Sequence, residues 1–258
     1  METDTEDKNL TNALVRGVKV LGAFRASDQG VSHTEICKRT GLSKATVSRL
    51  IHTLKMTGFV IQDTRSGLFQ LGPASVALGL VANAQTSFMD LIDDDMQELA
   101  DRTGTLALIG VRNRDRMMLV RTWRPTGAAS IWLEPGHRVP FLGSSTGQAF
   151  VAALSDAAFE ALDPDDELRA FRDDGYAQLV ANGFTSPPTD MRFAETINAV
   201  AVPYMAHEYG EPIAFSCGAL PDMLSDERIN TEVGPGLREL VRGLEVKTGQ
   251  ASALARRG

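Results

Sequence analysis

The segment Gly143-Ser144-Ser145-Thr146-Gly147 has the clearest potential for covalent chemistry in this sequence. It matches G-x-S-x-G, in which a serine on a tight turn is the nucleophile of α/β-hydrolases. Asp190 and His207 follow in the chain order that such a triad needs. These hydrolases also require alternating parallel βα units, which the chain lacks. His207 lies in a segment, 205–211, that predicts a hairpin turn, so we expect no catalytic residues and no enzyme.

A second cluster, Asp93-Asp94-Asp95, has the composition of a metal site. Consecutive residues of a helix point in different directions, so these carboxylates are expected to form a solvated helix face. Cys37 and Cys217 are the only cysteines, too few for a disulfide framework or a cysteine-rich zinc site. The sequence therefore predicts no metal, no cofactor and a reducing, cytoplasmic compartment.

Basic residues are concentrated near the N-terminal end. Between residues 9 and 80, nine Lys and Arg side chains accompany three Asp and Glu side chains, although the chain of 258 residues has a net charge of −7. This asymmetry is expected when one part of a protein meets phosphates. Chance clustering of surface lysines would give the same count, so charge alone does not decide the function.

The composition is that of an ordinary globular protein, with 43% hydrophobic and 23% charged residues. The length favours two domains. No apolar run is long enough for a membrane helix, and the acidic, polar start of the chain does not have the pattern of a signal peptide. Residues 1–10 are expected to be a disordered tail.

Residues 11–72 have the pattern of a winged helix-turn-helix. Apolar spacing predicts a first helix over 11–26. A capping box at Ser32 begins a second helix, and Gly41 ends it. Ser43 caps a third helix over 43–57, and a hairpin with Arg65 at its tip follows as the wing.

The exposed side of the third helix carries hydroxyl and basic residues, with no acid between Ser43 and Gly58. Such side chains reach phosphates and base edges in a major groove. A solvated helix face usually includes Glu or Asp, so the DNA-binding interpretation is favoured. For Arg65, an ordinary surface arginine is a real alternative. The candidate DNA-binding residues are Arg16, Ser43, Lys44, Ala45, Thr46, Ser48, Arg49, His52, Lys55 and Arg65.

The remaining chain predicts a linker helix over 73–85 and an α+β domain over 86–258, an antiparallel sheet packed against helices. Trp123 and Trp132 could face a ligand or fill its core, and the core is the favoured expectation. The strands are expected at 106–111, 117–122, 131–133, 199–204 and 212–218, and the helices at 86–102, 147–154 and 225–248.

Six segments of the sequence closely resemble the IclR family of bacterial regulators. They are Val15–Leu21, Glu35–Leu50, Phe69–Gly72, Gly136–Ala149, Ala199–Pro203 and Ala214–Gly218. The resemblance implies a winged helix-turn-helix followed by a GAF-like effector-binding domain. It also implies a sequence-specific transcriptional regulator, a repressor or an activator, that binds a palindromic operator on double-stranded DNA as a homodimer or a dimer of dimers.

The resemblance also places a small-molecule pocket in the C-terminal domain. The implied effector-binding residues are Gly143, Ser144, Ser145, Asn198, Ala199, Ser216 and Gly218. A helix start near Gly147 would attract an anion, so the expected effector is a carboxylate or an aromatic acid. The chain departs from the family pattern at Gln148, Ala199 and 185–197. A DNA-binding protein without a ligand, whose C-terminal domain only mediates oligomerisation, is the alternative.

Overall fold

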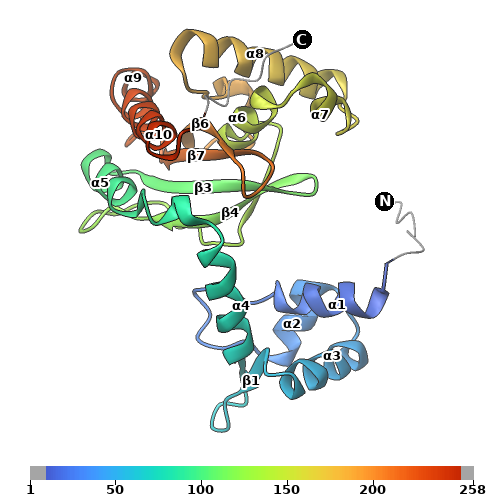
Figure 1. The fold of residues 1–258 in the computed structure, drawn as a ribbon. Coiled ribbons are helices and arrows are strands. Elements are labelled where there is room, and N and C mark those ends of the chain that lie inside the picture. The colour runs from blue at the N-terminus through green and yellow to red at the C-terminus, as the bar shows by residue number, and fades with distance from the viewer. Residues whose placement is uncertain (1–9, 251–258) are drawn as a thin grey trace. The chain divides into compact units, whose positions relative to one another are not determined.

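The computed structural model describes residues 10–250 (Figure 1), so the tail expected at 1–10 lies outside the described residues apart from Leu10. The chain divides into two compact units, one ending at Gln85 and the other beginning at Thr86. Each unit has its own hydrophobic core. None of the helices in the described part is long and apolar enough to cross a membrane.

The first unit has three helices, a hairpin and a fourth helix, in the order that the sequence predicts. The elements are α1 (Asn12–Leu21), α2 (His33–Thr40), α3 (Lys44–Met56), β1 (Val60–Gln62), β2 (Phe69–Leu71) and α4 (Pro73–Ala84). Ser32 caps α2, and Ser43 caps α3 by accepting the Thr46 amide. Gly41 has a φ of 68°, a left-handed conformation that lets the chain turn sharply between α2 and α3.

One core joins α1, α2, α3 and the hairpin. Its buried members are Val20, Val31, Ile36, Val47, Ile51, Val60 and Phe69. Strands β1 and β2 pair antiparallel, and Val31 forms an additional bridge with Phe69. Pro73 begins α4 at its first turn, where a helix does not need the missing N–H.

Helix α1 is shorter than the expected helix 11–26 and buries different side chains. It ends at Leu21, and the carbonyl of Ala23 accepts a hydrogen bond from Arg39 Nη1 instead of continuing the helix. Leu14 and Val18 belong to the apolar stripe from which the helix 11–26 is predicted, and they are 67% and 59% exposed. The surface of α1 therefore carries an apolar strip.

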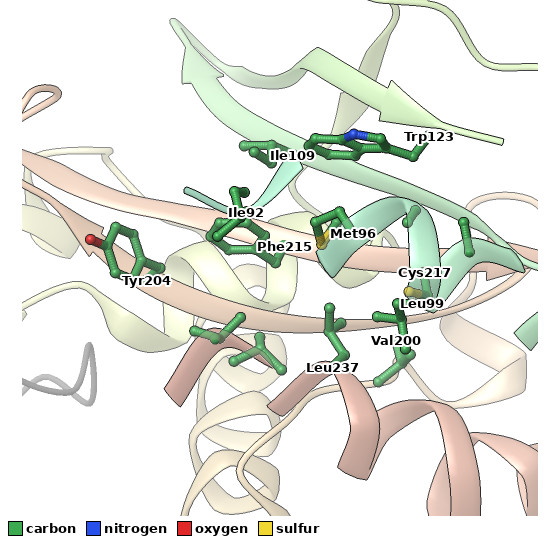
Figure 2. Close-up of a cluster of buried hydrophobic side chains, with 14 of the residues drawn as sticks. Ile92, Met96, Leu99, Ile109, Trp123, Val200, Tyr204, Phe215, Cys217 and Leu237 are labelled. Carbon is green, nitrogen blue, oxygen red and sulfur yellow. The ribbon is translucent and has the colours of Figure 1, made fainter. Parts of the chain in front are cut away.

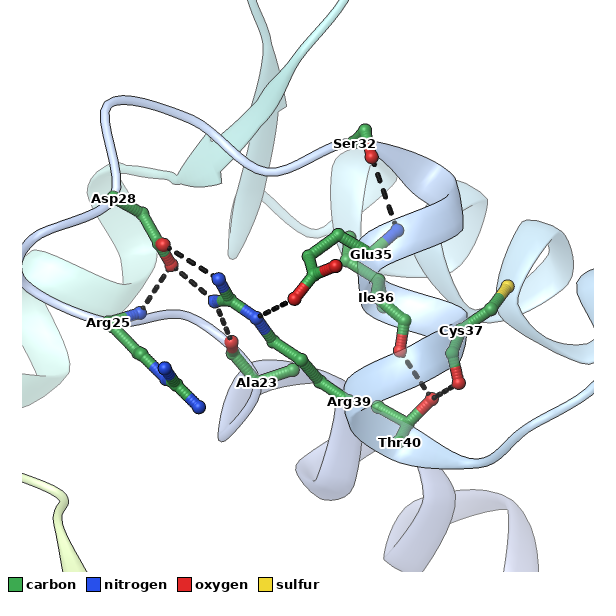
Figure 3. A network of polar contacts seen from close by, with 9 residues as sticks. All are labelled: Ala23, Arg25, Asp28, Ser32, Glu35, Ile36, Cys37, Arg39 and Thr40. Atoms are coloured by element: carbon green, nitrogen blue, oxygen red, sulfur yellow. Dashed lines mark hydrogen bonds and ion pairs between the residues drawn. The ribbon is translucent and has the colours of Figure 1, made fainter.

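Arg39 of α2 holds the loop that follows α1 (Figure 3). Its two Nη atoms donate to the two oxygens of Asp28, at 2.6 and 2.9 Å, and its Nε donates to Glu35 Oε1 at 2.9 Å. The hydrogen bond from Arg39 holds the pKa of Asp28 below its ordinary value. Arg39 thus stabilises the fold of the first unit.

The second unit is a five-stranded antiparallel sheet with helices on both faces, so the predicted α+β architecture is confirmed. The strand order is β5-β4-β3-β7-β6. The strands are β3 (Leu106–Asn113), β4 (Arg116–Trp123), β5 (Arg138–Pro140), β6 (Asn198–Ala206) and β7 (Glu211–Ala219). The helices are α5 (Asp93–Thr103), α6 (Ser145–Ala153), α7 (Asp156–Glu160), α8 (Asp166–Asn182), α9 (Asp226–Arg228) and α10 (Gly234–Thr248). Short helical turns lie at Ser87–Met89, Thr189–Met191 and Ile229–Val233.

Alternation along the strands gives the sheet two buried faces. On one face, Ile109 and Phe215 pack with Met96 of α5 and with side chains of α10 (Figure 2). On the other face, Ala214 packs with Phe150 of α6. Burial on both sides fixes the register, because a slip of one residue would exchange the two faces.

The segment 131–133 is not the buried strand that the sequence predicts. Gly127 and Gly136 both have positive φ and turn the chain at either end of the segment, so it does not align with the sheet. Trp132 is 61% exposed, and the guanidinium carbon of Arg124 lies 4.0 Å from the centroid of its ring. The prediction that Trp132 is a core residue is therefore wrong.

Trp123 is buried as predicted, and it contacts the first aspartate of the Asp93-Asp94-Asp95 cluster. Its Nε1 donates to Asp93 at 2.6 Å, and Asp93 also pairs with Arg121. The single helix expected over 86–102 is wrong, because the chain forms a short turn first and α5 begins only at Asp93. Three aspartates occupy the first turn of α5, where the helix dipole favours negative charge.

Candidate nucleic-acid interface and ligand cavity

Helix α3 turns a polar, basic face to solvent. It buries Val47 and Ile51 in the core and follows α2 after the turn at Gly41. This is the arrangement in which a second helix enters a major groove. Of the predicted contacts on α3 and at its cap, Thr46 is half-buried, and the exposed ones are Ser43, Lys44, Ala45, Ser48, Arg49, His52 and Lys55.

Hydrogen bonds hold some of these side chains and leave others available. Ser48 Oγ lies 2.9 Å from His33 Nε2, and Lys55 Nζ donates to Gln62 Oε1 at 2.8 Å. Both contacts tie α3 to a neighbouring element. Within residues 10–250, no hydrogen bond or ion pair occupies the guanidinium of Arg49. Arg49, like Lys44 on the same face, is therefore a long cation that is available to DNA.

Hydrogen bonds hold the backbone at the tip of the wing, and the side chain of Arg65 there is exposed to solvent. Asp63 Oδ1 accepts the amides of Arg65 and Ser66, at 2.8 and 2.7 Å. The hydrogen bond from the Ser66 amide is the largest cause of the lowered pKa of Asp63, and the one from the Arg65 amide is the next largest. The side chain of Arg65 is exposed.

Two other arginines of the first unit differ in availability. Arg16 of α1, a predicted DNA contact, is exposed. Arg39 is fully engaged with Asp28, Glu35 and a backbone carbonyl (Figure 3), so it contributes charge without an open guanidinium. The spacing of Glu35 and Arg39, four residues apart on a helix, is the signal that could have identified this pair.

The second unit contains an open cavity of about 560 Å³, with the solvent at its mouth included. Six predicted effector-binding residues line it: Gly143, Ser144, Ser145, Ala199, Ser216 and Gly218. Asn198 does not line it. The side chain of Asn198 is turned behind the wall, where Nδ2 donates to the Leu224 carbonyl and Oδ1 accepts from Arg192.

The wall at the start of α6 depends on close backbone contacts. Gly143 has a φ of 80°, and a Cβ there would lie 2.6 Å from the carbonyl oxygen of Met191. Ser144 caps α6 through the Gly147 amide at 3.0 Å. The helix consequently begins at Ser145, earlier than the expected start near Gly147.

Sequence reasoning missed much of the cavity. One missed residue is Arg192, whose side chain is 8% exposed and whose Nε donates to the Pro187 carbonyl at 3.0 Å. Its Nη2 pairs with Asp226 at 2.8 Å. The missed apolar lining includes Leu108, Leu119, Val139, Ile131, Leu133, Phe193, Ala194 and Ile197. Strand alternation could have identified Leu108 and Leu119, but the segments around residues 131 and 193 come from irregular loops.

The hydrolase interpretation of residues 143–147 finds no support in this geometry. The hydroxyl of Ser145 lies 3.2 Å from that of Ser216. Asp190 and His207 are not among the lining residues of the cavity, and His207 follows β6 in a turn. The sheet is antiparallel in every pair of strands described, whereas the nucleophile elbow belongs to a parallel βα unit.

A winged helix-turn-helix with an open basic face, followed by an α+β unit with a ligand-sized cavity, defines the class of DNA-binding transcriptional regulators. The family model for the IclR helix-turn-helix domain matches residues 13–64. The chain therefore contains an IclR-type helix-turn-helix domain and is similar to transcriptional regulators of the IclR family.

Individual relatives agree with this assignment. The chain is 28% identical to the HTH-type transcriptional regulator TsaQ1/TsaQ2 of Comamonas testosteroni over 54% of its own length and 51% of that protein. The match thus spans about half of that relative. An IclR family transcriptional regulator from Brucella abortus has 27% identity and a TM-score of 0.67, with 95% of this chain and 96% of that chain covered.

A more distant structure shares the fold. An IclR homolog from Microbacterium hydrocarbonoxydans, in complex with 4-hydroxybenzoate, has 18% identity and a TM-score of 0.67, with 91% of this chain and 96% of that chain covered. The Comamonas and Brucella relatives are transcriptional regulators rather than enzymes, in agreement with the expectation that this chain is not an enzyme.

Proposed function

We propose that this chain is a sequence-specific transcription factor, a repressor or an activator, whose operator binding is controlled by a small metabolite in the bacterial cytoplasm. Residues 11–72 would bind DNA, 73–85 would form the linker helix, and 86–258 would bind the effector. The observation that carries the proposal is the exposed, acid-free face of α3, in a chain that also contains a cavity of ligand size.

The proposed DNA contacts divide between base edges and phosphates. Arg49 has a guanidinium that can pair with both acceptors of a guanine, which gives sequence preference. Lys44 and the exposed hydroxyls near the N-terminal end of α3 suit phosphates, as does Arg16. Arg65 at the wing tip suits the backbone or the minor groove, which contributes affinity for any sequence.

Two exposed apolar surfaces support a homodimer. Helix α4 buries none of its residues, and Val76 and Leu80 are 59% and 66% exposed. Leu14 and Val18 of α1 are exposed as well. Surfaces of this kind favour association. A two-fold dimer would match a palindromic operator, and pairing of dimers is proposed from the family resemblance.

A carboxylate or aromatic acid is the proposed effector class. The amide groups at the start of α6 favour an anion, and the walls of the cavity are otherwise mostly apolar. The complex of the Microbacterium homolog with 4-hydroxybenzoate supports this class by analogy. The effector changes operator affinity if it binds one arrangement of the DNA-binding domains more tightly than another.

A release assay tests the control by a metabolite. The purified chain is bound to operator DNA and screened against small organic acids, together with Ser216→Phe, which fills the cavity, and Val180→Phe, which adds the same bulk to an exposed position of α8. We expect Ser216→Phe to bind the operator and to lose the response, while Val180→Phe retains it. A response that survives in Ser216→Phe would overturn the assignment of the cavity.

A further inference from the structure

Two hydroxyl groups meet on the wall of the cavity, and the direction of their hydrogen bonds limits what a ligand can offer them. Ser145 and Ser216 are 5% and 2% exposed, with 3.2 Å between their Oγ atoms. Ser216 Oγ also lies 2.8 Å from the carbonyl oxygen of Val200. A carbonyl oxygen has no proton, so Ser216 is the donor in that hydrogen bond.

As a result, both hydroxyl protons are donated to acceptors within the protein. Ser216 has a single proton, so Ser145 donates in the contact between the two side chains. The lone pairs of Ser145, and one of Ser216, are what the pair offers to a ligand. Ser144 adds no proton, because its Oγ donates to the Pro140 carbonyl and accepts the Gly147 amide.

Two other polar side chains line the cavity, and neither changes this balance. Thr146 Oγ1 lies 3.4 Å from Ser144 Oγ, whose proton is already donated, so Thr146 is the donor in that contact. Arg192 is the charged residue among the described lining residues. Its guanidinium donates to the Pro187 carbonyl, to Asn198 and to Asp226, so its charge is already paired. Most other lining side chains are apolar. Once a bound ligand covers these oxygens, an acceptor pair without a donor is unfavourable.

We infer that the effector has an apolar body with a hydroxyl group that donates to the Ser145–Ser216 pair. The inference rests on the proposed function of this cavity. A methyl ether of the same molecule has no proton to donate, and a carboxylate facing the pair would set lone pairs against lone pairs. A carboxylate on the same effector would therefore face backbone amide groups at the start of α6 rather than the oxygens of these two serines.

A set of matched probes tests the inference by calorimetry on the full chain. The probes are 4-hydroxybenzoate, 4-methoxybenzoate and benzoate. We expect 4-hydroxybenzoate to bind at least tenfold more tightly than the other two. In Ser145→Ala the preference should fall to threefold or less, with operator binding intact. The control, Ser130→Ala, changes a serine that does not line the cavity and should keep the full preference.

A second variant reverses the polarity of the site. Ser216→Ala removes the acceptor of the Ser145 proton, so Ser145 can donate into the cavity, and 4-methoxybenzoate should gain on 4-hydroxybenzoate. Equal binding of the three probes to the wild-type chain overturns the inference, as does failure of 4-hydroxybenzoate to bind. Operator release by a ligand without a hydroxyl also overturns the inference, but it supports the proposed function. If no compound binds the cavity or releases the operator, the proposed function fails as well.

Discussion

The proposed DNA-binding face of α3 and the cavity of the second unit both carry polar groups, but they are built in opposite ways. The α3 face consists of neighbouring residues on one helix, and Arg49 is exposed without an intramolecular partner. The cavity brings together β3, β4, β6, β7, the start of α6 and two loops. Its serine hydroxyls and Arg192 are buried and hydrogen-bonded within the protein.

This difference fits the two partners that we propose. DNA is a large polyanion that meets a surface, so its contacts can be long, solvated and ready to exchange water for phosphate. A small ligand must be enclosed, so the polar groups around it have to be satisfied before it arrives and then tolerate one more hydrogen bond. Variants should therefore separate the two sites by their effect on stability.

The largest effect on the free energy of unfolding is expected at Gly147, where the start of α6 packs directly against the backbone of Phe141. A Cβ on Gly147 would lie 2.1 Å from the carbonyl oxygen of Phe141, so Gly147→Ala should destabilise the second unit by about 3 kcal/mol or more. Gly79 of α4 has nothing within 4 Å, and Gly79→Ala should stabilise its helix by about 0.5–1 kcal/mol. Thermal unfolding of both variants checks this contrast, and similar midpoints would contradict it.

A smaller loss is expected from Asp28→Asn in the first unit. The variant removes the charge that Arg39 binds through two hydrogen bonds, at a cost of about 1.5–3 kcal/mol. The pKa of Asp28 is lowered in the folded chain, so its contribution is complete above the ordinary value of 3.8 and is lost as the pH falls through the lowered value. Denaturant unfolding from pH 7 to pH 2 should show this loss in the wild type and not in Asp28→Asn.

On the α3 face, substitutions should alter binding and leave the fold intact. Arg49→Ala should reduce discrimination between operator and scrambled DNA by about 1–3 kcal/mol. Arg65→Ala should weaken binding to both DNAs and lower the salt slope by about 1. Fluorescence anisotropy at several salt concentrations separates the two outcomes. Unchanged affinity and specificity in both variants would show that the contact surface lies elsewhere.

The smallest effect is expected at Trp132, on the surface of the second unit. Trp132 is 61% exposed and contacts Arg124 from the surface, so Trp132→Ala should change the free energy of unfolding by no more than about 0.5 kcal/mol. Denaturant unfolding measures this change. A loss of 2 kcal/mol would mean that Trp132 is buried, as the sequence alone predicts.

The same contrast explains how much the sequence could predict. The caps of α2 and α3 at Ser32 and Ser43 are local signals, and the structure has both. Leu14 and Val18 are spaced as a buried stripe, but spacing does not distinguish a core from a surface that another chain could cover. Arg192 was missed because tertiary contacts of a loop, rather than a regular element, bring it to the cavity.

The sequence predictions include no helix at α8, although its buried residues have helical spacing. Phe171, Gly175 and Leu179 recur at intervals of four residues and are buried. Many charged residues in the same segment obscure this stripe. The hydrogen-bond directions at Ser145 and Ser216 are different in kind, because they depend on a carbonyl from another strand and cannot be inferred from one sequence.

Binding of the purified chain to DNA from its own upstream region, with scrambled DNA as the reference and two salt concentrations, tests the central claim most directly. The account predicts selective binding that weakens as salt rises, because Lys and Arg contacts to phosphate displace counterions. The absence of DNA binding at either salt concentration would contradict it.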